Sequence, residues 1–170
     1  QCHSKNGIIS QDFDLVSALV SSFGEGLKIK DKKGRLPLHH AIANNASLQV
    51  VQLLLESYPE SVQEKDTAGN TPFSLSLNHE NKNPKEILLA LISAYPDCAK
   101  VLIPLPSHSA KMTPLLVAII CQQPFEVLEA LLAVYPEAGK IKCASLHPLH
   151  VIFSKYILKS GTYIPKCTSC

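Results

Sequence analysis

The sequence predicts an all-α fold, a solenoid of antiparallel helix pairs stacked in one row with hairpin-like turns protruding from one side. A Tyr-Pro dipeptide closes three apolar segments, 37 and 40 residues apart, at Tyr58, Tyr95 and Tyr135. A proline followed by Leu or Phe recurs in step with it, at Pro37, Pro72, Pro114 and Pro148. Self-similarity at this period is typical of repeat proteins, in which each unit contacts mainly its neighbours.

The unit from residue 31 to 65 shows how each helix pair is expected to form. A polar turn over residues 31–35 contains Gly34, where a positive φ is expected. Pro37 suits the first position of a short helix over about 37–44, because its missing N–H would have no partner there. Ser47 can cap a second helix over about 48–57, which ends before Pro59 because the residue preceding a proline disfavours the helical conformation.

The second helices carry the strongest periodic pattern. Counted back from the closing Tyr, apolar residues occupy positions −8, −7, −5, −4 and −3, and the same pattern precedes Phe23. Residues 12–30 are therefore expected to be the second half of another repeat. Because a stripe this wide must be covered on both sides, we expect the residues at −4 to be buried between repeats: Leu54, Leu91 and Leu131. A membrane span is disfavoured, because no apolar run reaches about 18 residues.

These patterns divide the chain into three parts. Residues 1–11 are expected to be a disordered N-terminal end, and residues 154–170 a tail that is either a degenerate cap or a linker. The repeat domain, 12–153, comprises a half repeat, three full repeats and a partial repeat, with bounds 12–30, 31–65, 66–107, 108–141 and 142–153. Because the chain starts at Gln1 with a half repeat, we expect it to be a fragment of a longer protein.

Two phrases carry a family resemblance. Residues 31–41 read D-K-K-G-R-L-P-L-H-H-A, and residues 66–76 read D-T-A-G-N-T-P-F-S-L-S. Both resemble the phrase D-x-x-G-x-T-P-L-H-x-A of the ankyrin repeat family. Residues 131–138 resemble a variant, L-L-x-x-Y-P-E-A, that is common in protist and algal ankyrin proteins. The resemblance covers about residues 12–153 and implies an ankyrin-repeat solenoid that serves as a binding scaffold.

The chain departs from the family phrase at its turns. Leu36 and His147 stand where the family has a threonine that caps the first helix, so weaker helix starts are expected there. In the third and fourth turns the glycine positions hold Lys111 and Ser145, and because neither favours a positive φ we expect remodelled turns. The segment 101–107 is longer than its counterpart after Tyr58, which indicates an exposed insertion.

Composition limits the partners and the compartment. The net charge of +2 does not favour nucleic acid, and the basic turn lacks the interleaved aromatic residues that stack on bases. The spacing of the six cysteines resembles no disulfide framework, which favours a reducing, intracellular and cytoplasmic setting. Cys167 and Cys170 could form half of a zinc site, but an unrelated tail is the favoured interpretation because no second pair follows. We expect no metal, no cofactor, no membrane partner and a monomer.

The sequence contains no catalytic constellation, and we expect that the chain is not an enzyme. No nucleophile elbow, P-loop or glycine-rich dinucleotide phrase occurs. His39 and His150 occupy the position where, by the resemblance, the imidazole hydrogen-bonds a turn of its own or a neighbouring repeat. Glu126 and Glu129 are expected to belong to a solvated helix face.

By the same resemblance, a partner is expected on the turn tips and on the exposed face of the first helices, along the concave side. The predicted contact residues are Lys32, Lys33, Arg35, His40, Asn70, Leu75, Met112, Val117, Leu146 and Val151. They would form a basic first turn and an apolar groove further along, although Lys and Glu could instead only keep an apolar stack soluble. The predicted function is a scaffold for a partner protein or peptide. The alternative is a regulatory or targeting segment of a larger enzyme, such as a kinase, or of a channel.

Overall fold

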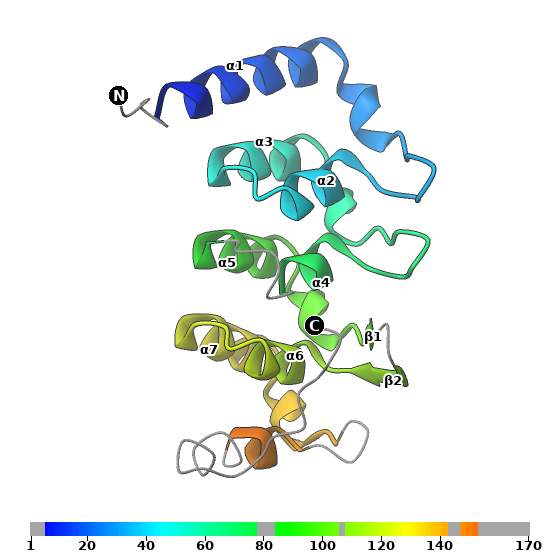
Figure 1. Cartoon of the computed structure of the whole chain (residues 1–170), viewed down its shortest axis with the longest axis vertical. Helices are drawn as coiled ribbons and strands as arrows, with labels where there is room; N and C mark the ends of the chain where they lie inside the picture. The colour runs from blue at the N-terminus through cyan, green and yellow to red at the C-terminus, as the bar shows by residue number, and fades with distance from the viewer. Residues whose placement is uncertain (1–5, 78–83, 106–107, 143–146, 153–170) are drawn as a thin grey trace, which may run out of the picture.

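The computed structural model describes residues 6–77, 84–105, 108–142 and 147–152. Its helices form two columns (Figure 1). The outer helices are α1 (Asn6–Ser22), α3 (Leu48–Ser57), α5 (Lys85–Ala94) and α7 (Phe125–Val134). The inner helices are α2 (Pro37–Ala43), α4 (Pro72–Leu77) and α6 (Pro114–Ile120). Each inner helix packs against the outer helix that follows it, and helices of one column pack against each other. The predicted all-α solenoid of stacked helix pairs is confirmed.

Each outer helix ends at an aromatic residue and continues into a short 3-10 helix. These are η1 (Gly24–Lys28), η2 (Pro59–Val62), η3 (Pro96–Lys100) and η4 (Pro136–Lys140). Tyr58, Tyr95 and Tyr135 leave the helical conformation, with φ of −146°, −142° and −137°, as expected for a residue before proline. The predicted cap of α3 is also confirmed, because the Val50 N–H donates to Ser47 Oγ at 3.4 Å.

The N-terminal end differs from the prediction. Residues 1–11 were expected to be disordered, but α1 starts at Asn6, so the prediction is wrong for residues 6–11. Continuation of the apolar pattern into Ile8 and Ile9 is consistent with the longer helix. The predicted tail, 154–170, lies outside the described residues. Among the helices that the structure describes, none has both the length and the apolar content needed to cross a lipid bilayer.

The first two turns share one internal geometry. We call residues 31–35 finger 1 and residues 66–70 finger 2. In each, the aspartate Oδ1 accepts the backbone N–H groups two and four residues ahead at 2.8 to 2.9 Å. The glycines have positive φ, 70° at Gly34 and 85° at Gly69, which confirms the prediction for Gly34. The Thr67 N–H donates to the Lys33 carbonyl at 2.9 Å, so finger 2 stacks directly on finger 1.

The third turn is a β-hairpin, as its lost Asp and Gly predicted a remodelled structure. Strand β1 (Ile103–Leu105) pairs antiparallel with β2 (His108–Met112). Ile103 lies opposite Met112 at the base of the hairpin, and both side chains are buried. The insertion predicted around 101–107 therefore extends this turn. The tip of the fourth turn, 143–146, lies outside the described residues.

The core is continuous along the stack and depends on neighbouring repeats. Leu54, Leu91 and Leu131 at position −4 are 4%, 0% and 1% exposed, which confirms their predicted burial. The equivalent Leu19 on α1 is 51% exposed, and Leu15 at −8 is 61% exposed. Within the described residues, α1 packs mainly against α3 and η1. The same apolar position is thus buried where another helix covers it and exposed where none does.

Candidate interaction surface

Asp31 organises finger 1. Its Oδ1 accepts the backbone N–H groups of Lys33 and Arg35, both at 2.8 Å, and its Oδ2 accepts from His40 Nε2 at 2.9 Å. The hydrogen bond from the Arg35 backbone is the largest contribution that holds the pKa of Asp31 below its usual value. The carboxylate is therefore ionised near neutral pH, and both of its oxygens are engaged within the fold.

Asp66 plays the same part in finger 2. Its Oδ1 accepts from the backbone N–H groups of Ala68 and Asn70, and its Oδ2 accepts from Asn70 Nδ2 at 3.2 Å. Burial raises the pKa of Asp66, but the hydrogen bonds from Asn70 and Ala68 together outweigh it, so the net pKa is lowered. Asn70, a predicted partner contact, is half-buried and its side-chain amide is used inside the turn.

His39 joins the start of α2 to finger 2. Its Nδ1 accepts from the Leu36 backbone N–H at 3.2 Å, and its Nε2 lies 3.3 Å from the Asn70 carbonyl oxygen, to which it donates. The ring is fully buried, and burial lowers the pKa of His39. The predicted structural role of this histidine is confirmed. The imidazole satisfies the N–H of Leu36 at the start of α2, while Leu36 makes no side-chain cap hydrogen bond, as its apolar side chain predicts.

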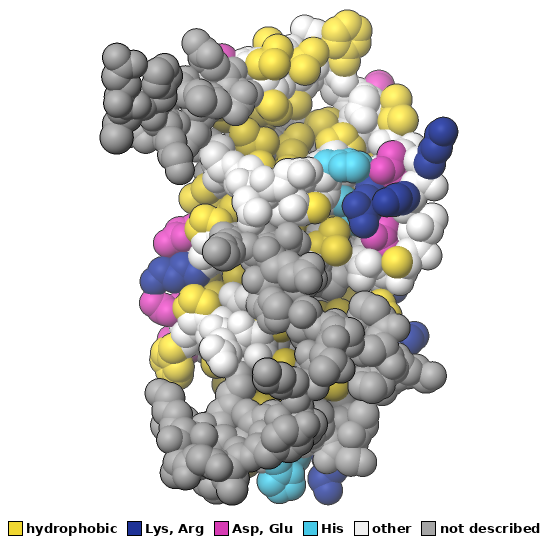
Figure 2. Space-filling model, viewed as in Figure 1, with side chains coloured by type: hydrophobic (Ala, Val, Ile, Leu, Met, Phe, Trp, Pro, Cys, Tyr) yellow, Lys and Arg dark blue, Asp and Glu magenta, His cyan; other side chains and the backbone are white. Residues whose placement is uncertain are grey.

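The two lysines of finger 1 are exposed, whereas Arg35 is half-buried beside finger 2. Lys32 and Lys33 are exposed, and neither forms an ion pair with a described residue. The Arg35 side chain is 28% exposed, and its Nε lies 3.6 Å from Asp66 Oδ2 without forming a hydrogen bond. Figure 2 shows Lys and Arg side chains gathered beside a His at the finger edge of the molecule. The structure thus places Lys32, Lys33 and Arg35 on finger 1 and His40 beside it, hydrogen-bonded to Asp31.

An open hollow of about 330 Å³ lies between finger 1, the start of α2 and the chain that follows η1. Ile29 and Pro37 are the apolar side chains of its lining, and the basic residues Lys30 and Arg35, together with His40, Asp31 and Gly26, complete it. Ile29 is 69% exposed. Neither Ile29 nor Pro37 was among the predicted contact residues. An isolated apolar residue between Lys28 and Lys30 was the available signal, but only the fold shows that it faces the finger.

The predicted apolar groove further along the stack is only partly present. Leu75 and Val151 are half-buried, whereas Val117 and Met112 are 8% and 6% exposed. The prediction that these last two residues are exposed for a partner is therefore wrong. Val117 belongs to the core because α6 is buried along most of its length, and Met112 packs at the hairpin base rather than at a tip. Leu146 lies outside the described residues.

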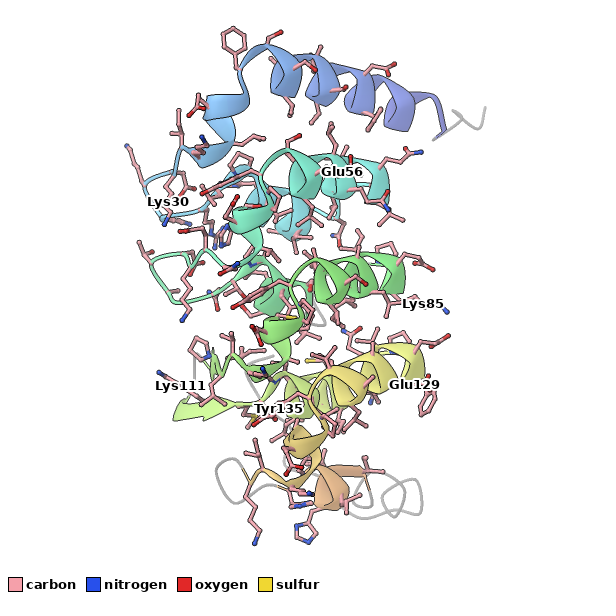
Figure 3. All side chains as sticks on the ribbon, turned by 180° about the vertical axis from the view of Figure 1, so that it is seen from behind. Lys30, Glu56, Lys85, Lys111, Glu129 and Tyr135 are labelled. Carbon is pink, nitrogen blue, oxygen red and sulfur yellow. The ribbon has the colours of Figure 1, made fainter. Side chains whose placement is uncertain are left out.

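Exposed acidic side chains occur on the outer helices. Glu56 on α3 and Glu129 on α7 are exposed, and Lys85 on α5 pairs with Glu126 on α7 at 2.6 Å. Figure 3 shows these outer helices at the opposite edge from Lys30 and Lys111, which lie on the turns. The two edges of the solenoid therefore differ in charge. Among the described residues, no cluster of three or more His, Cys, Asp or Glu side chains could hold a metal ion.

The comparisons with known proteins agree with this architecture. The family model of ankyrin repeats (3 copies) matches residues 6–93. Rabankyrin-5 of Mus musculus is 33% identical over 67 residues, which are 39% of this chain and 6% of that protein. An ankyrin repeat protein of Rickettsia felis is 31% identical over 85 residues, which are 50% of this chain and 22% of that protein. The chain thus matches only a small part of the length of either relative. With stacked helix pairs, positive-φ finger glycines and a family match over half of its length, the chain belongs to the ankyrin repeat family.

Proposed function

We propose that the chain is a protein-interaction module that binds a partner protein or peptide along its fingers and inner helices. Ankyrin repeats are generally non-catalytic protein–protein interaction modules, which supports this class of function. The proposal for this chain goes further, because it places the contact at finger 1, at the hollow beside it and at the half-buried Leu75 and Val151.

The observation that supports the proposal is that the carboxylate of finger 1 is hydrogen-bonded within the protein, while its two lysines are not paired with a carboxylate among the described residues. Asp31 directs both oxygens into the fold, while Lys32 and Lys33 remain exposed and form no ion pair with a described residue. Lysines that served only to keep the stack soluble would not need to gather on one finger. Ammonium and guanidinium groups beside an open, partly apolar hollow suit a polypeptide contact, in which Arg and apolar side chains often dominate the binding energy.

A capture experiment with matched variants tests the proposal. The immobilised chain would be incubated with a lysate of its source cells, and bound proteins would be quantified by mass spectrometry. Lys32→Glu/Lys33→Glu should remove a specific partner, whereas Glu56→Lys/Glu60→Lys on the outer side should retain it. Loss of the partner only with the outer-side variant would move the site to the outer helices. Val117→Glu would not test this contact, because Val117 is buried and an unpaired charge at this position would unfold the repeat.

The alternative function, a regulatory or targeting segment of a larger enzyme or channel, uses the same surface. It is favoured by one observation, that the matched segments are 6% and 22% of the two relatives. Attaching the segment to a reporter and following its recruitment, with and without Lys32→Glu/Lys33→Glu, would test a targeting role. A monomeric binding unit is part of the same proposal, and light scattering would test it.

An intracellular, cytoplasmic setting is likewise proposed. Cys98 is buried, and burial raises its pKa to about 12. A thiol in this state behaves as a small hydrophobe inside the core, which is compatible with a reducing compartment. Localisation of the tagged protein in its source cell would test this part of the proposal.

A further inference from the structure

The N-terminal finger offers a charge pattern that specifies more than a general protein contact. Between residues 30 and 40 the chain has four basic residues and one acidic residue, a net charge of +3 with His neutral, whereas the whole chain has +2. The positive charge of the molecule is therefore concentrated at finger 1 and its flank. Lys30 is compensated by Glu64 at 2.6 Å, but Lys32 and Lys33 have no such carboxylate among the described residues.

Finger 2 shows that the turn itself does not require these cations. The two fingers share the aspartate hydrogen bonds and the positive-φ glycine. At the positions equivalent to Lys32, Lys33 and Arg35, finger 2 has Thr67, Ala68 and Asn70. Because the same backbone forms with neutral residues, the charges of Lys32 and Lys33 are available for a role other than folding, whereas Arg35 also lies 3.6 Å from the buried Asp66 of finger 2.

The hollow beside finger 1 adds an apolar element to this charge. It is an open depression of about 330 Å³, unlike the concave pockets that bury most of a small ligand's surface. This size suits one large side chain of a partner better than an extended ligand. Ile29 and Pro37 would contact that side chain, and Arg35, His40 and Asp31 line the same space, where both Asp31 oxygens already accept hydrogen bonds from finger 1 and His40.

We infer that the segment bound at finger 1 is an acidic peptide of the partner protein, with one aliphatic or aromatic side chain seated in the hollow against Ile29 and Pro37. The inference rests on the proposed function and adds the chemistry of the partner. Carboxylates of the peptide would meet Lys32, Lys33 and the accessible part of Arg35. Charge complementarity of this kind speeds association and excludes basic partners, and an apolar anchor limits dissociation.

Selection of short random peptides displayed on phage tests the inference. The full chain and the variant Lys32→Thr/Lys33→Ala/Arg35→Asn would be used in parallel. This variant gives finger 1 the residues of finger 2, Asp-Thr-Ala-Gly-Asn, so its turn should fold, and circular dichroism would verify this. Peptides selected on the wild-type chain should be rich in Asp and Glu around a Leu, Ile or Phe. Their affinity, measured by fluorescence anisotropy, should fall about tenfold in the variant and decrease with added salt.

Two further measurements separate the apolar anchor from charge alone. Ile29→Ser, at a side chain that is 69% exposed, should weaken the selected peptide without changing the stability of the fold. Polyglutamate without an apolar residue should compete poorly, and so should a single-stranded oligonucleotide. If polyglutamate competes as well as the selected peptide, the apolar side chain does not contribute and that part of the inference is wrong. If the oligonucleotide competes as well as the selected peptide, the inference of a peptide ligand is wrong.

The inference and the proposed function can fail separately. Selected peptides with no excess of acidic residues, or with equal affinity for the wild-type chain and the triple variant, would overturn the inference. A natural partner that is nevertheless lost with changes on the inner side would leave the proposed function intact. A partner or peptide that depends only on Glu56 and the outer helices would overturn both.

Discussion

Leu91→Ala, compared with Leu19→Ala, tests whether neighbouring repeats supply the stability of this fold. Both residues occupy position −4 of an outer helix. Leu91 is 0% exposed and Leu19 is 51% exposed, because α5 lies between α3 and α7 while α1 has only α3 beside it among the described outer helices. The two variants therefore remove the same atoms from equivalent positions, one buried and one half-exposed.

The expected magnitudes follow from burial. Removing a buried Leu side chain costs about 2–5 kcal/mol, as lost transfer free energy plus a cavity term. For Leu91 we expect about 3 kcal/mol, because packed helices on both sides prevent the site from collapsing. At Leu19 about half of the transfer term is absent and no closed cavity forms, so we expect about 1 kcal/mol or less. Leu54→Ala and Leu131→Ala should resemble Leu91→Ala.

Equilibrium unfolding in urea, followed by circular dichroism, measures this difference. With a slope of about 2 kcal/mol/M, Leu91→Ala should lower the midpoint by about 1.5 M and Leu19→Ala by about 0.5 M or less. The dependence of the unfolding free energy on urea concentration should be the same in all variants. A change in this slope would indicate that the repeats unfold separately. Equal shifts for the two variants, or an unchanged midpoint for Leu91→Ala, would refute the assigned register and the dependence on neighbours.

Three other changes test local features of the fold. Gly34→Ala should lower the free energy of unfolding by about 1–2 kcal/mol, because φ is 70° and a Cβ would lie 3.2 Å from the Thr67 backbone nitrogen. Gly26→Ala is the control, because the space around Gly26 is open. It should lower the melting temperature less than Gly34→Ala does. Burial lowers the pKa of His39 below 6.5, so the folded state binds its proton less readily than the unfolded chain does. The stability that neutral His39 contributes is thus present above pH about 6.5 and is lost as the pH falls from there to the folded-state pKa. Urea unfolding at neutral and mildly acidic pH should show this loss, and His39→Gln should reduce the pH dependence. Thr113→Ala should cost about 1 kcal/mol in a thermal melt, since Thr113 is buried and caps α6; an unchanged melting temperature would exclude a contribution from the cap.

The candidate surface was predicted best where the deciding interactions are local. Lys32 and Lys33 lie on a turn whose aspartate and glycine define it, so their exposure could be expected from the sequence. Val117 and Met112 occupy positions that looked equivalent to exposed ones, but longer-range packing places both in the core. The hollow beside Ile29 could not be predicted, because it forms between segments that meet only after α2 and η1 have packed.

By itself, the sequence determined the order of the helix pairs that the structure describes, the C-terminal ends of α3, α5 and α7, and the turn geometry of finger 1. Proline, cap residues and positive-φ glycines act within a few residues of their own position, so their effects on helix ends and turns can be predicted from the sequence. Only the tertiary structure decided which members of the repeated pattern are buried. Leu19 and Leu91 share one place in the pattern, yet one is half-exposed and the other fully buried, because burial depends on the helix packed above each of them rather than on the residue itself.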